Sequence, residues 1–392
     1  MKFVMLFVTL LSCANHAQTI KVLHYNIKEL DSTKINKARE GKLAQLKYAS
    51  EIIQKFSADI ISINEIQYDK EDVPSTSFKT RGQNLRTLGK LSGLKNFNYS
   101  FDEANTGMNS KPGINGEYIL KPTASDRRNY ADSVNFGMFP GQYSTGGIFK
   151  YPIKKRSIIS SLKWRDFNPK INLNKYKDTN GNRLPVDMEL FDKNFSDITL
   201  DVNGKEVHII LLHTVPAFGF GNKFTPNFER NHDQLEFLKW YLTGKSKFKN
   251  NLKIKHLKKG TRFIAMGDWN VDPASTNPGG KIIKELGEKF TYVLTNNDKT
   301  YVGQNFGVDG YSAELDYILV SKNISVLKAG IHYPTSEREE IGCGPYTKQN
   351  RPNKVLVSYK QGPKVCKAWV SKEFYKTKKA SDHLAIWAKL KI

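Results

Sequence analysis

The sequence predicts an α/β fold, because a strand, a helix and a second strand follow one another near its start. Residues 19–26 alternate in hydropathy like a strand, and apolar residues then recur at helical spacing over residues 43–56. Residues 59–65 form a short apolar run that is typical of a buried strand. In sheets built from such units, ligands bind at the strand ends. The side chains that close these two strands, Asn26 and Glu65, are therefore candidates for function.

A later apolar run at residues 263–267 ends directly before Asp268 and Asn270. At an extended strand end, a spacing of two residues puts both side chains on the same side of the chain. A carboxylate and an amide placed in this way suit a site that holds one phosphate or the water that attacks it. Gly-Asp-x-Asn is also ordinary turn chemistry. The segment therefore indicates a site only if other strand ends supply matching groups.

Three further strand-like runs supply such groups. A predicted hairpin over residues 196–212, with an Asn-Gly turn, ends at His213. A later strand begins beside Asp316, and Asp382 and His383 precede the terminal strand. Each of these residues alone is more often a cap, a turn or a surface residue than a catalyst. Together with the residues above they indicate one site, whose members are Asn26, Glu65, His213, Asp268, Asn270, Asp316, Asp382 and His383.

The residue types of this set favour one chemistry. Carboxylates from several strands hold a hard divalent cation such as Mg²⁺ or Mn²⁺ through oxygen ligands. The sequence has no cysteine and histidine spacing of a zinc site, no G-x-S-x-G nucleophile elbow and no phosphate-binding P-loop. An oxygen-ligated metal beside histidine and aspartate is what metal-assisted hydrolysis of a phosphoester requires. The set therefore predicts a metal-dependent phosphoesterase.

The chain resembles the endonuclease/exonuclease/phosphatase superfamily, whose members have the DNase I-like fold. The matching motifs occur in the family's order, and as a set they are specific. They lie at residues 23–27, 59–66, 211–214, 267–270, 315–318 and 381–383. Residues 181–187 and 230–233 further resemble exported bacterial members. The resemblance implies a four-layer α-β-β-α sandwich, in which helices flank two packed mixed β-sheets.

The same resemblance implies which residues bind metal and phosphate. Glu65 is the expected principal metal ligand, Asn26 helps to place metal and phosphate, and Asp382 completes the metal site or orients a histidine. The expected ion is Mg²⁺, with Mn²⁺ or Ca²⁺ as alternatives. Tyr143 is a candidate phosphate contact.

The catalytic roles implied by the resemblance fall on five residues. Asp268 is expected to orient or deprotonate the attacking water, and Asn270 to hold the phosphate. His383 is expected to act as base or phosphate clamp, supported by Asp316. His213 matches the position that protonates the leaving oxygen in the DNase I branch, although the candidate partner strand offers it no acid.

The first residues of the chain, 1–17, have the layout of a secretory signal peptide. Lys2 precedes an apolar run at residues 3–11 that is too short to span a bilayer, and small residues follow it. A box typical of bacterial lipoproteins makes a lipid anchor at Cys13 an alternative. We therefore expect a secreted or periplasmic protein with one domain over residues 18–392 and no transmembrane segment in the mature chain.

Two features of that domain are left open by the sequence. Cys343 and Cys366 remain after the signal is removed, and they form either a disulfide or two free thiols. Long loops are expected at about 102–147, 165–195 and 333–380, and substrate choice would lie there.

The net charge of +23 favours a polyanionic partner. The leading hypothesis is an exported nuclease that acts as a monomer on nucleic acid and has no stable protein partner. A groove that tracks a nucleic acid backbone needs positive charge. Basic clusters lie close to the motifs, at Lys372, Lys376, Lys378 and Lys379 and at Lys150, Lys154, Lys155 and Arg156.

Other functions stay open. The same fold serves phosphatases of inositol phosphates and sphingomyelinase-like phosphodiesterases of phospholipid headgroups, whose anionic substrates also suit a basic surface. A sphingomyelinase would need an exposed apolar hairpin, and residues 333–380 show only scattered aromatic residues. A non-catalytic binding protein would have lost the metal ligand or a catalytic histidine, whereas Glu65 and His383 are both present.

Overall fold

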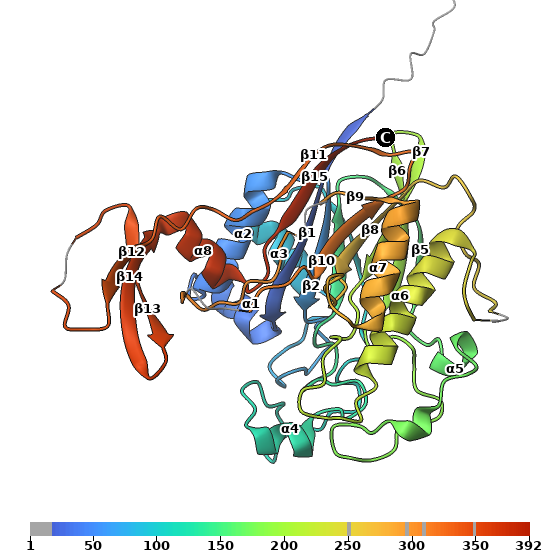
Figure 1. Ribbon diagram of the computed structural model, residues 1–392, viewed down its shortest axis with the longest axis horizontal. Coiled ribbons are helices and arrows are strands. Elements are labelled where there is room, and N and C mark those ends of the chain that lie inside the picture. Colours follow the sequence, from blue (N-terminus) through green and yellow to red (C-terminus); the bar gives the residue numbers. More distant parts are fainter. Residues whose placement is uncertain (1–17, 249–251, 295–297, 308–310, 348–349) are drawn as a thin grey trace, which may run out of the picture.

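The computed structural model describes residues 18–248, 252–294, 298–307, 311–347 and 350–392. The predicted signal peptide, with its lipid-anchor site at Cys13, lies outside the described residues. Within them, two six-stranded sheets pack together and helices lie on the outer side of each sheet (Figure 1). The predicted α/β sandwich is thus confirmed. Among the described residues, no helix combines the length and the apolar character needed to cross a bilayer.

The first sheet is built around the predicted strand–helix–strand unit. The strands β1 and β2 of this unit are parallel, and Asn26 lies opposite Asn64 in their register. The strand order is β11 (Ser325–Ile331), β15 (Ile386–Lys391), β1 (Thr19–Leu30), β2 (Ile60–Ile66), β4 (Thr145–Phe149) and β3 (Asn98–Phe101).

The second sheet contains the predicted hairpin. Its two strands, β6 and β7, are joined at Asn203 and Gly204, which both have positive φ, as a tight two-residue hairpin turn requires. The strand order is β5 (Ile153–Ile159), β6 (Phe195–Val202), β7 (Lys205–Leu212), β8 (Phe263–Asp268), β10 (Asp316–Val320) and β9 (Thr291–Tyr292).

The core between the sheets is made by the inward faces of both. Ile20 and Ile60 of the first sheet belong to the same buried cluster as Ile209, Ile264 and Ile318 of the second. Burial of one such side chain stabilises the folded state by roughly 1.5–3 kcal/mol. This packing fixes the two sheets against each other, and so it also fixes the strand ends that carry the predicted site residues.

Helices bury their apolar faces on the outer sides of the sheets. On the first sheet, Leu46 and Ile53 pack with Ile61, and on the second sheet, Leu235 and Ile283 belong to the cluster that covers it. The helices of the first side are α1 (Ser32–Arg39), α2 (Ala44–Phe56), α3 (Asn84–Leu91) and α8 (Lys372–Ala380), and those of the second are α6 (Asn227–Thr243) and α7 (Pro278–Lys289).

Two of the expected long loops are mainly irregular, and the third is not a loop. Residues 102–147 and 165–195 contain only short helical turns between the strands, namely α4 (Ala124–Tyr130), α5 (Trp164–Phe167) and η1 (Leu173–Lys175). Residues 333–380 instead contain α8 and a separate three-stranded sheet of β12 (Glu339–Gly342), β14 (Lys364–Ser371) and β13 (Lys354–Gln361).

We call residues 333–371 the C-terminal arm, and it lies to one side of the two-sheet body (Figure 1). Its hairpin corrects the expected loop, although short apolar runs at residues 355–357 and 368–370 are visible in the sequence. The inner face packs only on a small cluster that includes Val357, Ala368 and Phe374. A disulfide joins Cys343 to Cys366 within the arm. Of the two alternatives, a disulfide or two free thiols, the structure has the disulfide.

Candidate active site

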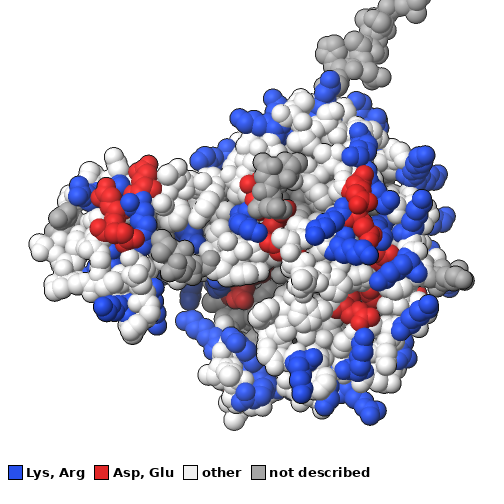
Figure 2. All heavy atoms as spheres, in the orientation of Figure 1, with Lys and Arg blue, Asp and Glu red and all other residues white. Residues whose placement is uncertain are grey.

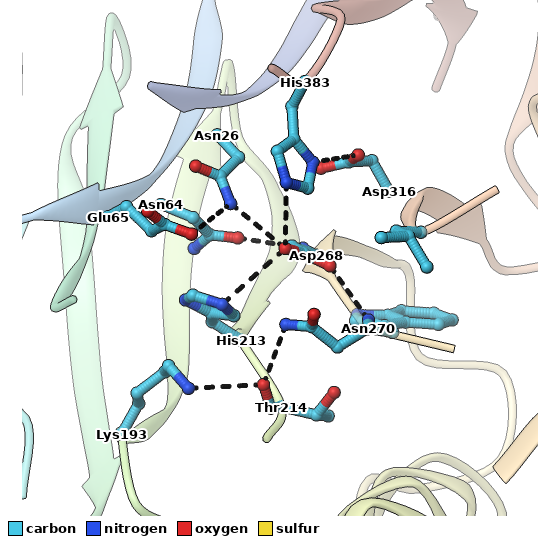
Figure 3. Close-up of polar contacts among 12 residues, drawn as sticks. Asn26, Asn64, Glu65, Lys193, His213, Thr214, Asp268, Asn270, Asp316 and His383 are labelled. Carbon is cyan, nitrogen blue, oxygen red and sulfur yellow. Dashed lines mark hydrogen bonds and ion pairs between the residues drawn. The ribbon is translucent and has the colours of Figure 1, made fainter. Parts of the chain in front are cut away.

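The ends of β1, β2, β7, β8 and β10 bring most of the predicted residues to one place (Figure 3). Asp268 at the end of β8 lies directly opposite Asp316 at the start of β10. The peptide of Asp268 is also held from both sides, because its N–H donates to Asn64 Oδ1 at 2.8 Å and its carbonyl accepts from Thr214 N at 3.1 Å. The site is therefore built on sheet edges rather than on long loops.

Steric crowding explains why the residue before Asp268 is a glycine. A Cβ atom at Gly267 would lie 1.6 Å from the carbonyl oxygen of Leu212, at the end of β7. Only a residue without a side chain allows this close approach of the two chains. The approach sets His213, the next residue after Leu212, beside Asp268. The Gly-Asp pair is thus part of the site's construction and not only turn chemistry.

Asp268 is the centre of the site. Its Oδ2 atom lies 3.7 Å from Nε2 of His213 and 3.7 Å from Nε2 of His383, and it accepts a hydrogen bond from Asn26 Nδ2 at 3.0 Å (Figure 3). Burial raises the pKa of this carboxyl to about 7, the carboxylates of Asp316 and Glu65 add to the rise, and His383 opposes it. Asp268 is therefore the carboxylate that faces His213, at a distance beyond that of a hydrogen bond.

His383 is held by a chain of hydrogen bonds behind it. Its Nδ1 lies 2.7 Å from Oδ2 of Asp316, whose Oδ1 lies 3.0 Å from Nε2 of His24, and Nδ1 of His24 lies 3.1 Å from Ser62 Oγ. Burial disfavours the charged imidazole of His383, but Asp316 and Asp268 outweigh this effect and raise its pKa to about 10. His383 is therefore a cation at neutral pH in this arrangement. That charge favours the clamp role over the base role.

His213 has the opposite electrostatics. Its side chain is buried, and burial together with the nearby ammonium of Lys193 lowers its pKa well below the usual range. The imidazole is therefore neutral at neutral pH in the free protein. Two histidines flank one carboxylate, and their environments push their pKa values in opposite directions, which is a common way to separate acid and base roles.

Glu65 and Asn26 occupy the corner beside Asp268. The amide nitrogen of Asn26 donates to Glu65 Oε1 and to Asp268 Oδ2, both at 3.0 Å, while its oxygen accepts from the Lys28 backbone N–H at 3.1 Å. The backbone of Glu65 has a positive φ of 62°, which is uncommon for a residue with a side chain and recurs at functional sites. Burial raises the pKa of the Glu65 carboxyl. A cation beside the carboxylate would offset the cost of burying its charge.

Two groups of side chains have ligand atoms close enough to share one metal ion. They are Glu65, His213 and Asp268, and Asp268, Asp316 and His383, with ligand atoms within 4.8 Å of one another. Asp316 and His383 are already paired with each other. The carboxylate oxygens of Glu65 and Asp268 therefore fit a hard divalent cation better than the second group does.

Asp382 and Tyr143 lie at the margin of this arrangement. Asp382 Oδ2 is 2.8 Å from Nζ of Lys28, and Tyr143 OH donates to Glu29 Oε1 at 3.3 Å. Asp382 adds to the rise that burial causes in the pKa of Glu65. Glu65 in turn adds to the rise that burial causes in the pKa of Tyr143. The metal role of Asp382 and the phosphate role of Tyr143 stay predictions.

Sequence reasoning missed a buried lysine at the site. Lys193 Nζ lies 2.6 Å from Asp192 Oδ2. It also donates to the carbonyl oxygen of Thr214 at 3.3 Å (Figure 3). The same carbonyl accepts from Asn270 Nδ2 at 3.0 Å, and Asp268 Oδ1 accepts from the Asn270 N–H at 2.9 Å. Lys193 lies in an irregular segment, and no periodic signal marks it. His24 and Asn64 were missed because they lie inside apolar strands.

The motif at residues 230–233 supports the site from behind. Asn231 Nδ2 donates to Thr214 Oγ1 at 2.9 Å, to Val215 O at 2.8 Å and to Trp269 O at 3.0 Å. Arg230 is buried and donates to the carbonyl oxygen of Leu190 at 3.0 Å. Asn231 therefore ties the segments that follow β7 and β8 together, and Arg230 holds the segment at Leu190 against α6.

Comparison with known proteins agrees with this geometry. The model of the Endonuclease/Exonuclease/phosphatase family matches residues 23–383. The chain belongs to this family. Family members are metal-dependent phosphoester hydrolases, so the protein is a metal-dependent hydrolase that acts on phosphoester bonds. A search of curated proteins finds no match.

Solved structures of the family are similar to the chain at low sequence identity. An endonuclease/exonuclease/phosphatase from Beutenbergia cavernae DSM 12333 is 12% identical, with a TM-score of 0.53, over 95% of this chain and 72% of that one. A family protein from Leptotrichia buccalis C-1013-b is 13% identical, with a TM-score of 0.49, over 95% of this chain and 100% of that one. A mannosyl-6-phosphatase from Bacteroides thetaiotaomicron VPI-5482 is 10% identical, with a TM-score of 0.46, over 95% and 100%. At these identities the likeness concerns the fold alone.

Proposed function

We propose that this phosphoesterase is an exported, divalent-metal-dependent nuclease that hydrolyses phosphodiester bonds of nucleic acids. The observation that carries the proposal is the placement of His213 and His383 at equal distances from Asp268. Cleavage of a diester needs an activated water on one side of the phosphorus and a proton for the leaving oxygen on the other. A carboxylate between two imidazoles provides groups for both tasks.

Each side chain then has a task that follows from its environment. Asp268 orients the attacking water or accepts its proton, and in the metal-free protein burial raises its pKa to about 7. Protonated His383 donates from Nε2 to a phosphoryl oxygen, while Asp316 holds its ring from Nδ1. Asn270, fixed by Thr214, holds the phosphate.

His213 is left to protonate the leaving oxygen. Because burial keeps it neutral in the free protein, it needs the negative charge of a bound phosphate to raise its pKa and hold a proton. Glu65 and Asp268 would hold the metal, with Mg²⁺ as the proposed ion. A bound divalent cation offsets the charge that develops on the phosphoryl oxygens.

The charge of the whole protein supports a polyanionic substrate. The sequence carries a net charge of +23, and Lys and Arg side chains are spread over the face shown in Figure 2, with acidic side chains in smaller groups. Such a surface attracts nucleic acid through its phosphates and makes binding strongly dependent on salt. Export is supported by the Cys343–Cys366 disulfide, since disulfides persist mainly in oxidising compartments.

The test is a substrate panel with residues 18–392 in Mg²⁺, Mn²⁺ or Ca²⁺, each compared with EDTA. The substrates are supercoiled plasmid, single-stranded RNA, bis-p-nitrophenyl phosphate and p-nitrophenyl phosphate. We expect metal-dependent cleavage of nucleic acid that weakens steeply with added salt. Untouched nucleic acid together with cleavage of a small ester would reject the nuclease and favour a phosphatase or lipid phosphodiesterase. Inactivity on all four would favour a non-catalytic binding protein.

A further inference from the structure

The segment that follows His213 exposes an unusual number of phenylalanine rings. We call residues 215–228, between β7 and the first turn of α6, the phenylalanine loop. Its rings are exposed by 61% at Phe218, 69% at Phe220, 43% at Phe224 and 38% at Phe228. Single exposed apolar residues are normal, but a cluster of large ones in one segment marks a binding surface.

The backbone of the phenylalanine loop is held in place. Asn227 Nδ2 donates to the Phe218 carbonyl at 3.0 Å, and Asn222 Nδ2 donates to the Lys177 carbonyl at 3.1 Å. The Lys177 N–H in turn donates to the Phe224 carbonyl at 3.0 Å. The rings therefore project from a braced backbone, and their exposure is a property of the fold.

The phenylalanine loop is attached directly to the residue proposed to bind phosphate. The N–H of Ala217 donates to the carbonyl of Asn270 at 3.1 Å, and the side chain of Asn270 donates to the carbonyl of Thr214 at 3.0 Å. Phe218 is the next residue after Ala217, so their Cα atoms are only about 3.8 Å apart. The exposed rings thus begin at the rim of the active site.

Positive charge accompanies the rings. The ammonium groups of Lys223 and Lys177 lie 5.0 and 5.4 Å from the ring centroid of Phe224. Phe218 and Phe220 contact each other edge to face, with centroids 4.9 Å apart and ring planes at 88°. Exposed aromatic rings near lysines are what proteins use to bind single-stranded nucleic acid, since bases stack on the rings and phosphates pair with the cations.

We propose that the phenylalanine loop stacks on unpaired bases next to the scissile phosphate, so that the enzyme cleaves single-stranded nucleic acid in preference to duplex. The inference rests on the proposed nuclease function and narrows its substrate class. In a duplex the base faces are stacked on one another inside the helix, and the rings have no free face to meet. The aromatic contact is tolerant of sequence, because every base has a π-face.

The decisive experiment pairs a ring deletion with a base deletion. The variant Phe218→Ala/Phe220→Ala and the wild type are compared on a single-stranded oligothymidine and on an abasic strand of the same length. On oligothymidine we expect kcat/KM of the variant to be lower by about tenfold or more. On the abasic strand the two proteins should be equal, because the rings have no base to contact. Equal losses on both strands would overturn the proposal, and so would no loss on either.

Conservative variants separate stacking from simple apolar contact. Phe220→Tyr keeps a flat ring and should retain activity, whereas Phe220→Leu keeps an apolar side chain and should lose it. The control Val365→Ala removes an exposed apolar side chain from the C-terminal arm and should have no effect. The proposal would be overturned in favour of a lipid surface by two results together. Phe220→Leu would keep full activity, and the wild type but not the double variant would bind phosphatidylcholine–phosphatidylserine vesicles.

Failure of the nuclease function has its own signature. If the wild type cleaves bis-p-nitrophenyl phosphate but neither oligothymidine nor plasmid, the proposed function is wrong and this inference falls with it. If the wild type cleaves oligothymidine and plasmid at equal rates and the double variant is unimpaired, only the role of the phenylalanine loop is wrong.

Discussion

Asp316 accepts a hydrogen bond from Nδ1 of His383 at 2.7 Å, and both side chains are buried. The contact fixes the imidazole ring so that its other nitrogen faces Asp268 at 3.7 Å. Asp316 comes from a strand of the second sheet, and His383 comes from the segment that leads into a strand of the first. The site is therefore assembled only when the two sheets pack together.

Replacing the orienting carboxylate tests this contact. In Asp316→Asn, His383 loses the partner that raises its pKa, so that pKa falls and the protonated form is lost at lower pH than in the wild type. We expect kcat/KM to drop about 10²–10⁴-fold, as for loss of a positioned acid–base group. His383→Ala should cost about as much, and the double variant little more, because the residues act as a unit. Steady-state kinetics measure the losses in kcat/KM, and an NMR titration of His383 measures the fall in its pKa. Additive losses would contradict it.

The buried pair of Lys193 and Asp192 predicts a stability effect. The two side chains are 5% and 7% exposed and lie 2.6 Å apart, and the carboxyl of Asp192 also accepts from Gln234. Lys193→Met leaves a buried carboxylate without its cation, which we expect to cost about 3–5 kcal/mol of unfolding free energy. Adding Asp192→Asn should recover part of that loss. Urea denaturation of the four proteins of the cycle measures both, and a double variant as unstable as the sum of the single variants would refute the coupling.

His332 predicts how stability depends on pH. Burial and the nearby Lys55 lower its pKa to about 4, from an ordinary value of 6.5. Between these pH values the unfolded chain binds more protons than the folded protein. The stability that neutral His332 contributes to the folded state is therefore present above about pH 6.5 and is lost as the pH falls towards 4. His332→Gln removes the titrating group. Its stability relative to the wild type should therefore rise, by on the order of 1–2 kcal/mol, between pH 7 and pH 4. A constant difference in urea denaturation at the two pH values would count against this reading.

The disulfide of the C-terminal arm predicts a local effect. Cys343 and Cys366 are separated by 23 residues, and in the chain-entropy model such a bridge stabilises by about 3 kcal/mol. In Cys343→Ser/Cys366→Ser, amide hydrogen exchange should speed up in β13 and β14 but not in the two large sheets. Hydrolysis of bis-p-nitrophenyl phosphate should be retained, because α8 still packs on α2. Faster exchange throughout the body would show that the arm and the body unfold together.

The strand-end residues that the sequence placed together do lie together, for a physical reason. Asn26, Glu65 and Asp268 close apolar runs whose period is visible in the sequence, and the ends of adjacent strands meet. The same logic could not find Lys193, which an irregular segment carries to the site, nor His24, which lies inside a buried strand. It could not show that Asp268 serves both histidines, because that depends on the packing of one sheet against the other.

The C-terminal arm and the phenylalanine loop were missed for a different reason. The hairpin of the arm has only short apolar runs, at residues 355–357 and 368–370, and they pack over a small core. Phe218 and Phe220 are of a residue type that is usually buried in the core, so the sequence does not mark them as exposed. Only the structure shows that their rings point into solvent beside the site.

Asp268, between two histidines and beside Glu65, is the centre of the proposed metal-dependent cleavage of nucleic acid. The most direct measurement is single-turnover cleavage of a labelled single-stranded oligonucleotide by wild type and Asp268→Asn, with Mg²⁺ and with EDTA. We predict cleavage by the wild type in Mg²⁺, and a loss of at least about 100-fold on removing either the metal or the carboxylate. Cleavage by Asp268→Asn at the wild-type rate, or cleavage that persists in EDTA, would contradict the claim.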